Sequence, residues 1–431
     1  MIQHFTKETV LTFSILPPLY LPFYNEWCAN AYSTYSKFSY DPFTLRASST
    51  SGSPVVLTGT CFFGFMNDLG GHFSYDGCNK LTITCPAGQV LYYNENCNPY
   101  AEWLEYNREI LKNYTAPKTE DFWSGLEYCT WVDQKHKAAQ ENAATLQAPL
   151  CEEFVYDYMR RVNKLKLPKG KLTIDDGWDV RYSDDGKMCY GNWQIDRNKF
   201  PHMETLVKDM KEDGFFPGLW FAPFTLTPNS ELAKKHPELL GEPFGGSAES
   251  EAVRKLMCIK PEPALEPVLI EYYTKIFSYY IDMGFCKFKL DMSYGNKREM
   301  TKLLKMMYTI IKSLNSTVEV EAHIPDIFSS RYCDTVRLND VMFDEKDAWR
   351  EVTMEHYKVC RYSSSDKILN LDHLGTNVPL PAAELYLEHT KILLDLPGGY
   401  PCVSLLPDHF DRKTCDEFTA RVRAWQEQAN K

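Results

Sequence analysis

The chain lacks a long uninterrupted apolar run and any surplus of positive charge. Its 431 residues carry 47 Lys and Arg against 58 Asp and Glu, a net charge of -11, and no basic stripe. Because clustered Lys and Arg are what bind a phosphate backbone, we expect no nucleic-acid partner. The apolar stretch 10–24 is broken by Pro17, Pro18 and Pro22, so we expect neither a membrane span nor a signal peptide.

Metal-binding cysteine patterns are also missing. The 14 cysteines form no CxxC pair and no Cys/His zinc spacing. This argues against a structural metal site and favours reduced thiols over a compact disulfide scaffold, which is typical of a cytoplasmic protein. No feature of the sequence indicates an oligomeric state.

Hydrophobic residues make up 44% of the chain and aromatic residues 14%, enough for one large domain and an accessory one. Residues 1–115 are rich in β-type runs, at 9–16, 54–65 and 80–86, separated by turn clusters. We therefore predict a small β-rich N-terminal domain at 1–115, similar to a truncated β-sandwich. A polar helical stretch at 101–114 leads to the boundary, and the second domain spans 116–431.

From residue 116 onward, short apolar strands alternate with amphipathic helices, a pattern that favours a parallel sheet built from βα units. Eight strands are predicted, at 126–131, 171–176, 216–224, 285–291, 317–323, 332–340, 367–372 and 400–406. Two helices stand out, one with Met203, Leu206 and Met210 before Gly214, and one that ends at Gly284. Eight units predict a (β/α)8 TIM barrel, with a doubly wound sheet as the alternative.

Polar residues cluster where these strands end, which is where a barrel of this kind carries its chemistry. The candidates are Asp175, Asp176 and Trp178 after the second strand, Trp220 on the third, Lys289 and Asp291 on the fourth, and Arg337 and Asp340 on the sixth. Each acid alone could be a turn residue or a helix cap. Three acids at three strand ends are harder to explain as independent caps.

Two carboxylates facing each other across a pocket are what glycoside hydrolysis requires. Asp291 and Asp340 are the candidates for this pair. Lys289 lies two residues before Asp291 and so points to the same side of the strand. Its positive charge would hold the pKa of Asp291 down and keep that carboxylate ionised.

The ordered motifs resemble the α-galactosidase and raffinose-synthase group of glycoside hydrolases, family 36. The resemblance spans 128–408 and rests on "YCTWVDQ", "IDDGW", "GNWQIDRNKFP", "GLWFAPF", "HPELL", "FKLDM", "VRLND" and "GGYPCVSLLPD". Each motif alone is weak, but their succession in this order is specific.

The resemblance implies a retaining, double-displacement hydrolase that needs no metal or organic cofactor. Asp291 would be the nucleophile and Asp340 the general acid/base. Asp175 and Asp176 would accept hydrogen bonds from galactosyl hydroxyls. The remaining substrate-binding residues would be Trp178, Trp220, Lys289 and Arg337. The expected partner is an oligosaccharide or other glycoside.

The chain departs from the family pattern in several places. One Asp follows "RLN" where relatives often carry two, so Asp344 is the alternative acid/base, and Ala222 stands where relatives have Glu. The N-terminal domain is short, and the chain ends soon after the eighth strand. Three functions therefore stay open, namely an α-galactosidase-like hydrolase, a galactosyltransferase or a hydrolase of another α-glycoside, and a catalytically silent carbohydrate-binding protein.

Overall fold

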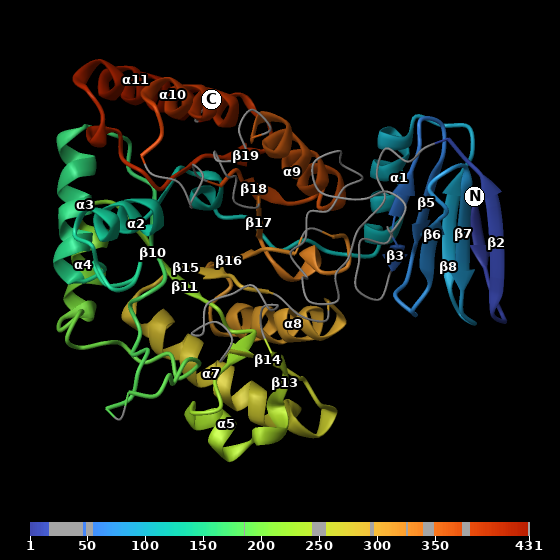
Figure 1. Ribbon diagram of the computed structural model, residues 1–431, viewed down its shortest axis with the longest axis horizontal. Helices are drawn as coiled ribbons and strands as arrows, with labels where there is room; N and C mark the ends of the chain where they lie inside the picture. The colour runs from blue at the N-terminus through green and yellow to red at the C-terminus, as the bar shows by residue number, and fades with distance from the viewer. Residues whose placement is uncertain are drawn as a thin grey trace.

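The computed structural model describes residues 1–16, 46–48, 55–184, 186–243, 256–293, 297–324, 326–338, 349–372 and 380–429. A β-rich N-terminal domain lies on one side of a larger α/β domain, and helix α1 lies between them (Figure 1). The predicted fold class, a TIM barrel preceded by a β-rich domain, is confirmed.

The N-terminal domain consists of two four-stranded antiparallel sheets, with strand orders β1-β8-β5-β4 and β2-β7-β6-β3. Its strands are β1 Ile2–His4, β2 Thr9–Ser14, β3 Arg46–Ser48, β4 Val55–Leu57, β5 Phe62–Phe65, β6 His72–Tyr75, β7 Lys80–Cys85 and β8 Val90–Asn94. Alternate residues of β5 serve two cores, since Phe63 and Phe65 join the core of the N-terminal domain whereas Phe62 contacts α1. The predicted β-type runs contain β2, β4, β5 and β7, whereas β1, β3, β6 and β8 lie outside them.

Helix α1 (Pro99–Leu111) links the N-terminal domain to the barrel. The side chain of Asn98 accepts hydrogen bonds from the first-turn amides, and Pro99 occupies the first turn. The side-chain amide of Asn107 donates to the carbonyl of Tyr362 at 2.6 Å, on the barrel side of the helix. The division near residue 115 stays a prediction.

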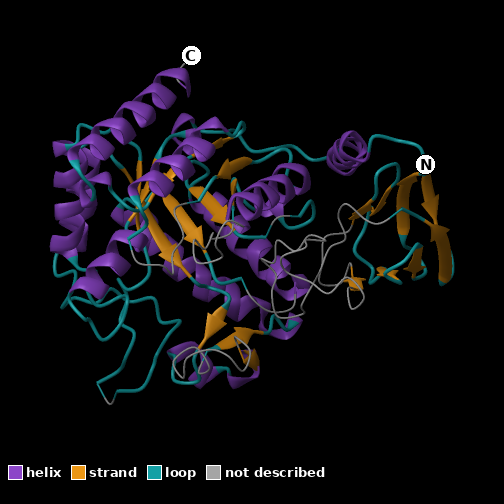
Figure 2. Ribbon diagram, turned by 45° about the horizontal axis from the view of Figure 1, so that its top comes forward, coloured by secondary structure: helices purple, strands orange, loops and turns teal. Residues whose placement is uncertain are grey.

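The barrel sheet has the order β19-β18-β17-β16-β15-β11-β10-β9-β20 and is parallel throughout. Its strands are β9 Glu127–Cys129, β10 Lys171–Ile174, β11 Phe216–Phe221, β15 Lys287–Leu290, β16 Glu319–Ala322, β17 Thr335–Arg337, β18 Ile368–Asn370, β19 Gly399–Tyr400 and β20 Cys402–Val403. All eight predicted strands are present. Figure 2 shows these strands surrounded by helices.

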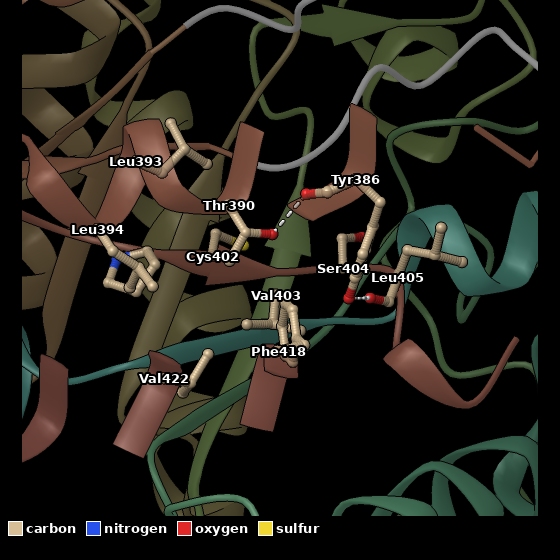
Figure 3. Close-up of a pocket in the computed structure, with 11 residues that line it drawn as sticks. Tyr386, Thr390, Leu393, Leu394, Cys402, Val403, Ser404, Leu405, Phe418 and Val422 are labelled. Carbon is tan, nitrogen blue, oxygen red and sulfur yellow. Dashed lines mark hydrogen bonds between the residues drawn. The ribbon is translucent and has the colours of Figure 1, made fainter. Parts of the chain in front are cut away.

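The eighth strand is split into β19 and β20 by Pro401, which has no backbone N–H for the ladder. The β20 half still pairs with β9 and closes the barrel. Behind it, the Tyr386 hydroxyl donates to the carbonyl of Leu405 at 2.8 Å, beside a small cavity of about 30 Å³ (Figure 3).

Helices surround the sheet. They are α2 Trp131–Gln140, α3 Glu152–Lys164, α4 Met203–Glu212, α7 Glu266–Met283, α8 Lys297–Leu314, α9 Trp349–Ser363, α10 Ala383–Asp395 and α11 Arg412–Ala429. The predicted helix before Gly214 is α4, with Met203, Leu206 and Met210 buried. The predicted stop at Gly284 is the left-handed cap of α7, at φ 115°. A small excursion after β11 carries β12 Thr225–Leu226, α5 Glu231–Lys235, β13 Leu240–Pro243 and β14 Met257–Ile259.

One crossover differs from the regular pattern. In the described part of the connection from β16 to β17, a 3-10 turn at Ser330–Tyr332 stands where a (β/α)8 barrel has an α-helix. The connection is short, and Asp326 ties it together by accepting hydrogen bonds from the amides of Phe328 and Ser329. The N-terminal domain approaches nearby, since Asp68 accepts hydrogen bonds from two guanidinium nitrogens of Arg298 on α8, at 2.8 and 2.9 Å.

The barrel interior below the strand ends is filled by ion pairs instead of the usual branched apolar side chains. Lys287 lies 2.5 Å from a carboxylate oxygen of Glu127 and 2.6 Å from one of Glu321. Lys171 lies 3.2 Å from Glu319, and all five side chains are at most 1% exposed. Burial alone would lower the pKa of Lys287, but the surrounding glutamates raise it, so this ammonium stays charged.

We expect Lys287→Met to destabilise the chain by about 3–5 kcal/mol, because the change leaves Glu127 and Glu321 buried without their cation. Urea unfolding at neutral pH measures this loss. Lys208→Met is the matched control, since Lys208 is exposed and forms a helical pair with Glu212. Equal stability of the two variants would contradict the interpretation.

Candidate active site

The charges of β15 all belong to one face of the strand. Lys287, Lys289 and Asp291 alternate with the buried apolar residues Phe288 and Leu290. Because side chains alternate across a strand, the polar set points into the barrel and the apolar set packs under the helices. The parallel register aligns Trp220 on β11 with Lys289, which brings both strand ends to the same rim.

Asp291 lies at the centre of a ring of hydrogen-bond donors. Its Oδ1 accepts the amide N–H of Met292 at 2.7 Å, and its Oδ2 accepts the indole N–H of Trp220 at 3.2 Å. The Arg337 guanidinium lies 3.3 Å from Oδ2, and the Lys289 ammonium lies 3.9 Å from it. The Asp291 side chain is 18% exposed, more than the side chains of Lys289 and Arg337.

The environment favours the ionised form of Asp291. Burial alone would raise the pKa of this carboxyl, but the Arg337 guanidinium, a hydrogen bond from His323 and the Lys289 ammonium hold its pKa well below its usual range. The predicted influence of Lys289 is therefore present, and Arg337 contributes more.

Lys289 connects the second and fourth strands. Its Nζ lies 2.8 Å from Oδ2 of Asp175, and the Cys129 thiol donates to the same oxygen at 3.0 Å. Burial would lower the pKa of Lys289, yet the Asp175 carboxylate raises it well above the usual value. Asp175 and Lys289 thus form a charged pair beside Asp291.

Asp176 has its own partners. Its Oδ2 accepts the side-chain N–H of Gln147 at 2.8 Å, and its Oδ1 pairs with Arg181, which also contacts Asp179. Burial raises the pKa of Asp176 above its usual value. The two adjacent acids therefore lie in different environments, Asp175 against Lys289 and Asp176 against Arg181.

Every nitrogen of the Arg337 guanidinium faces an acid. One terminal nitrogen donates to Asp372 at 3.0 Å, the other faces Asp291, and Nε lies 3.8 Å from Glu321. The sequence predicted a sugar contact for Arg337. In the structure Arg337 holds Asp291, and its contact with a sugar stays a prediction.

The two predicted tryptophans lie in different places. Trp220 is next to Asp291, as described above. Trp178 is fully buried, with its indole N–H donating to the carbonyl of Trp220 at 2.8 Å and its ring packed on Phe221 and Tyr280. Trp178 supports β11 in this structure, and its role in substrate binding stays a prediction.

Sequence reasoning missed His323 and Asp372 as members of the site. The ring Nδ1 of His323 lies 3.3 Å from Asp291 Oδ1 and 3.2 Å from an Arg337 nitrogen, while Asp372 holds the same arginine. The missed signal was the two-residue period, which places Glu319, Glu321 and His323 on one face of β16. Asp340 and its alternative Asp344 lie outside the described residues.

Within the described ranges, no group of three or more His, Cys, Asp or Glu side chains is arranged to hold a metal ion. In the same ranges, no helix is both long enough and apolar enough to cross a membrane. The 13 described cysteines are free thiols.

The part of the chain that contains the second and third strands of the barrel is similar to a known family. Residues 155–256 match the Melibiase family model. The chain is 40% identical to α-galactosidase AgaA of Geobacillus stearothermophilus over an aligned segment of 68 residues. This segment is 16% of this chain and 9% of that protein. Over 85 residues it is 32% identical to an α-galactosidase of Escherichia coli, covering 19% and 12%. The aligned segments thus span about a tenth of these relatives' length.

Solved structures share the fold across nearly the whole chain. An α-galactosidase from Thermus thermophilus in complex with p-nitrophenyl α-D-galactopyranoside superposes with a TM-score of 0.67 at 16% identity, covering 96% of this chain and 88% of that one. A family 31 α-xylosidase from a soil metagenome, complexed with xylose, also superposes with a TM-score of 0.67. Its sequence is 13% identical, and the superposition covers 98% of this chain and 65% of that one. Identities this low establish the fold alone.

The Melibiase match contains Asp175, Asp176 and Trp220 but stops before the fourth strand. Asp291, Lys289 and Arg337 therefore enter the site through their geometry in the structure and not through this match.

The depressed pKa of Asp291 predicts a pH dependence of stability. The pKa of Asp291 is lower in the folded chain than in the unfolded chain. Ionised Asp291 therefore stabilises the fold at pH values above 3.8, the ordinary pKa of Asp, and this contribution is lost as the pH falls through the folded pKa. We expect acidification from pH 6 to pH 3 to cost the parent more unfolding free energy than Asp291→Asn. Denaturant unfolding of both chains at the two pH values measures this difference.

Arg337→Met should raise the pKa of Asp291. In the Arg337→Met chain, the loss of unfolding free energy between pH 6 and pH 3 should therefore differ less between Asp and Asn at position 291. The variant itself should lose about 3–5 kcal/mol, as expected when one partner of a buried ion pair is removed. Arg421→Met, which breaks a half-exposed helical pair with Glu417, is the control. An unchanged pH difference in Arg337→Met would refute the role given to this guanidinium.

Proposed function

We propose that this chain is a retaining glycoside hydrolase that removes terminal α-galactosyl units. The match of residues 155–256 to the Melibiase family model and the local similarity to α-galactosidases support this proposal. The observation that carries the proposal is Asp291, an ionised carboxylate at a barrel rim, surrounded by donors and more exposed than the cations that hold it.

In the proposed first step, Asp291 attacks the anomeric carbon while the glycosidic C–O bond breaks and Asp340 protonates the leaving oxygen. In the second step, Asp340 takes a proton from water, the water oxygen attacks the same carbon, and the Asp291 ester bond breaks. Oδ2 is the better candidate for the attacking oxygen. Oδ1 accepts a 2.7 Å hydrogen bond from the Met292 amide, whereas the donors around Oδ2 lie at 3.2 Å or more.

Lys289 and Asp175 support selection of the sugar. Oδ2 of Asp175 is occupied by Lys289 and Cys129, whereas Oδ1 accepts one backbone amide and keeps a second lone pair for a sugar hydroxyl. A galactosyl 4-hydroxyl would donate to such an acceptor. A glucosyl epimer would leave it unpaired, at a cost on the order of 1–3 kcal/mol.

The most direct test is a screen of nitrophenyl α-glycosides with the purified chain. We expect release from the α-galactoside and a rate about 10⁴-fold lower for Asp291→Asn, because the change removes the nucleophile without changing its size. Asp395→Asn, at an exposed residue of α10 that pairs with Lys391, is the control and should keep the parent rate. Release of another sugar, or equal rates for parent and Asp291→Asn, would contradict the proposal. Adding a sugar acceptor separates hydrolysis from transfer, because a galactosyltransferase would give a longer oligosaccharide and little free galactose.

The acid/base assignment has a separate test. Nitrophenolate leaves without help from a proton, whereas a sugar leaving group needs protonation. In Asp340→Asn, the first-turnover rate should therefore fall more for raffinose hydrolysis than for nitrophenol release. The two rate losses should differ by about 10²-fold or more. Asp344→Asn serves as the comparison. If Asp344→Asn shows this pattern and Asp340→Asn does not, the roles of the two residues are exchanged.

A further inference from the structure

A hollow lies on the outer wall of the barrel, outside the ring of donors around Asp291. It lies between α7, α5 and the segment 192–197, and its volume is about 860 Å³. We call it the α7 groove. Figure 1 shows α5 next to α7 at the edge of the barrel. The groove side of α7 includes Val268, Tyr272, Lys275, Tyr279 and Asp282, which repeat every three to four residues along one face of the helix. Small-molecule sites typically have roughly 300–1,000 Å³, so the size suits a short oligomer.

The walls of the α7 groove are joined by hydrogen bonds. The Tyr280 hydroxyl donates to the carbonyl of Trp193 at 2.6 Å, and the Tyr272 hydroxyl donates to that of Gly191. On the opposite side, the Glu231 amide donates to the side chain of Asn192 at 2.8 Å. The segment is thus attached to both α7 and α5, and the groove is already formed without a ligand.

Aromatic rings form the floor and one rim of the groove. Trp193, Tyr272 and Tyr280 lie at the floor, and Trp193 adopts a left-handed backbone at φ 53°, which a bulky residue rarely does. Tyr279 is 47% exposed at the rim, and an Arg197 nitrogen donates to its hydroxyl at 3.2 Å. Arg197 is in turn held by both oxygens of Glu204, so the exposed ring is fixed in place.

The charged side chains around the groove balance in sign. Three are basic and three are acidic, and they are Arg197, Lys235, Lys275, Glu231, Glu271 and Asp282. His236 lies on the same rim, 3.2 Å from Glu238. A balanced rim gives no net attraction for a phosphate or an amine, but it offers many donors and acceptors to a neutral ligand rich in hydroxyls.

The floor of the groove also contacts the wall of the candidate active site. The ring of Trp193 lies 6.2 Å from that of Trp220, edge to face, and the Trp220 indole N–H donates to Asp291. The groove is therefore a neighbour of the site and separated from it by two indoles.

We propose that the α7 groove binds a neutral oligosaccharide, with a sugar ring stacked on Tyr279 and its hydroxyls bonded to the mixed charged rim. A fixed aromatic ring beside balanced donors and acceptors matches the two faces of a sugar, one apolar from C–H groups and one polar from hydroxyls. This binding is independent of hydrolysis.

The test is a calorimetric titration of the full chain with maltotetraose and with stachyose. Maltotetraose contains no galactosyl unit, so it probes the groove apart from the proposed reaction. We expect Tyr279→Ala to weaken binding of maltotetraose at least tenfold, with nitrophenyl α-galactoside hydrolysis unchanged. Tyr182→Ala, at a tyrosine that is 50% exposed elsewhere on the surface, should bind like the parent.

Two results would overturn the proposal, namely no binding of either sugar by the parent, or equal affinity in Tyr279→Ala and the parent. Lys275→Glu gives a second check, because it unbalances the rim without touching the core. It should weaken maltotetraose binding, and unchanged binding would also count against the groove. If Tyr279-dependent binding is present but nitrophenyl α-galactoside is not cleaved, the groove stands and the proposed function fails. The opposite pattern leaves the hydrolase standing alone.

Discussion

The site depends on one electrostatic arrangement, a carboxylate kept ionised inside a mostly buried rim. An isolated carboxylate in that position would be protonated, because burial disfavours its charge. At Asp291, the Arg337 guanidinium, the Lys289 ammonium and the donors of Trp220 and Met292 compensate for the lost water. Lys289 and Met292 belong to the fourth strand and its end, Trp220 to the third strand on one side, and Arg337 to the sixth strand on the other side. The fold is therefore needed to assemble them.

The cations are held by further acids below and beside them. Asp372 and Glu321 lie against Arg337, Asp175 lies against Lys289, and the glutamates of the barrel interior hold Lys287. Charge therefore alternates from the barrel centre to the rim. Buried ion pairs contribute little net stability, but removing one partner leaves the other unpaired at high cost. We infer that this alternation keeps the geometry around Asp291 unique more than it stabilises the fold.

Much of the fold could be predicted from the sequence, because local patterns encode it. The short apolar runs between amphipathic helices predicted the eight strands, and Gly284 predicted the end of α7. The split at Pro401 and the missing α-helix before β17 were not foreseen, since they arise from barrel closure and a short connection. In the site, the spacing of two residues along a strand correctly predicted that Lys289 lies on the same side as Asp291. It did not show that Arg337 and Trp220 would turn toward Asp291, because that depends on contacts between strands far apart in sequence. The burial of Trp178 was not foreseen for the same reason, since a signature motif does not tell whether a ring faces a ligand or the core.

The central claim is that Asp291 forms the bond to the sugar. A fluorinated galactosyl fluoride, whose glycosyl-enzyme hydrolyses slowly, can trap that bond, and peptide mass mapping can locate it. The account predicts one added fluorogalactosyl unit on the peptide that contains Asp291, and none on the Asp291→Asn chain. A label on a different carboxylate, or an unlabelled chain that still cleaves α-galactosides, would contradict it.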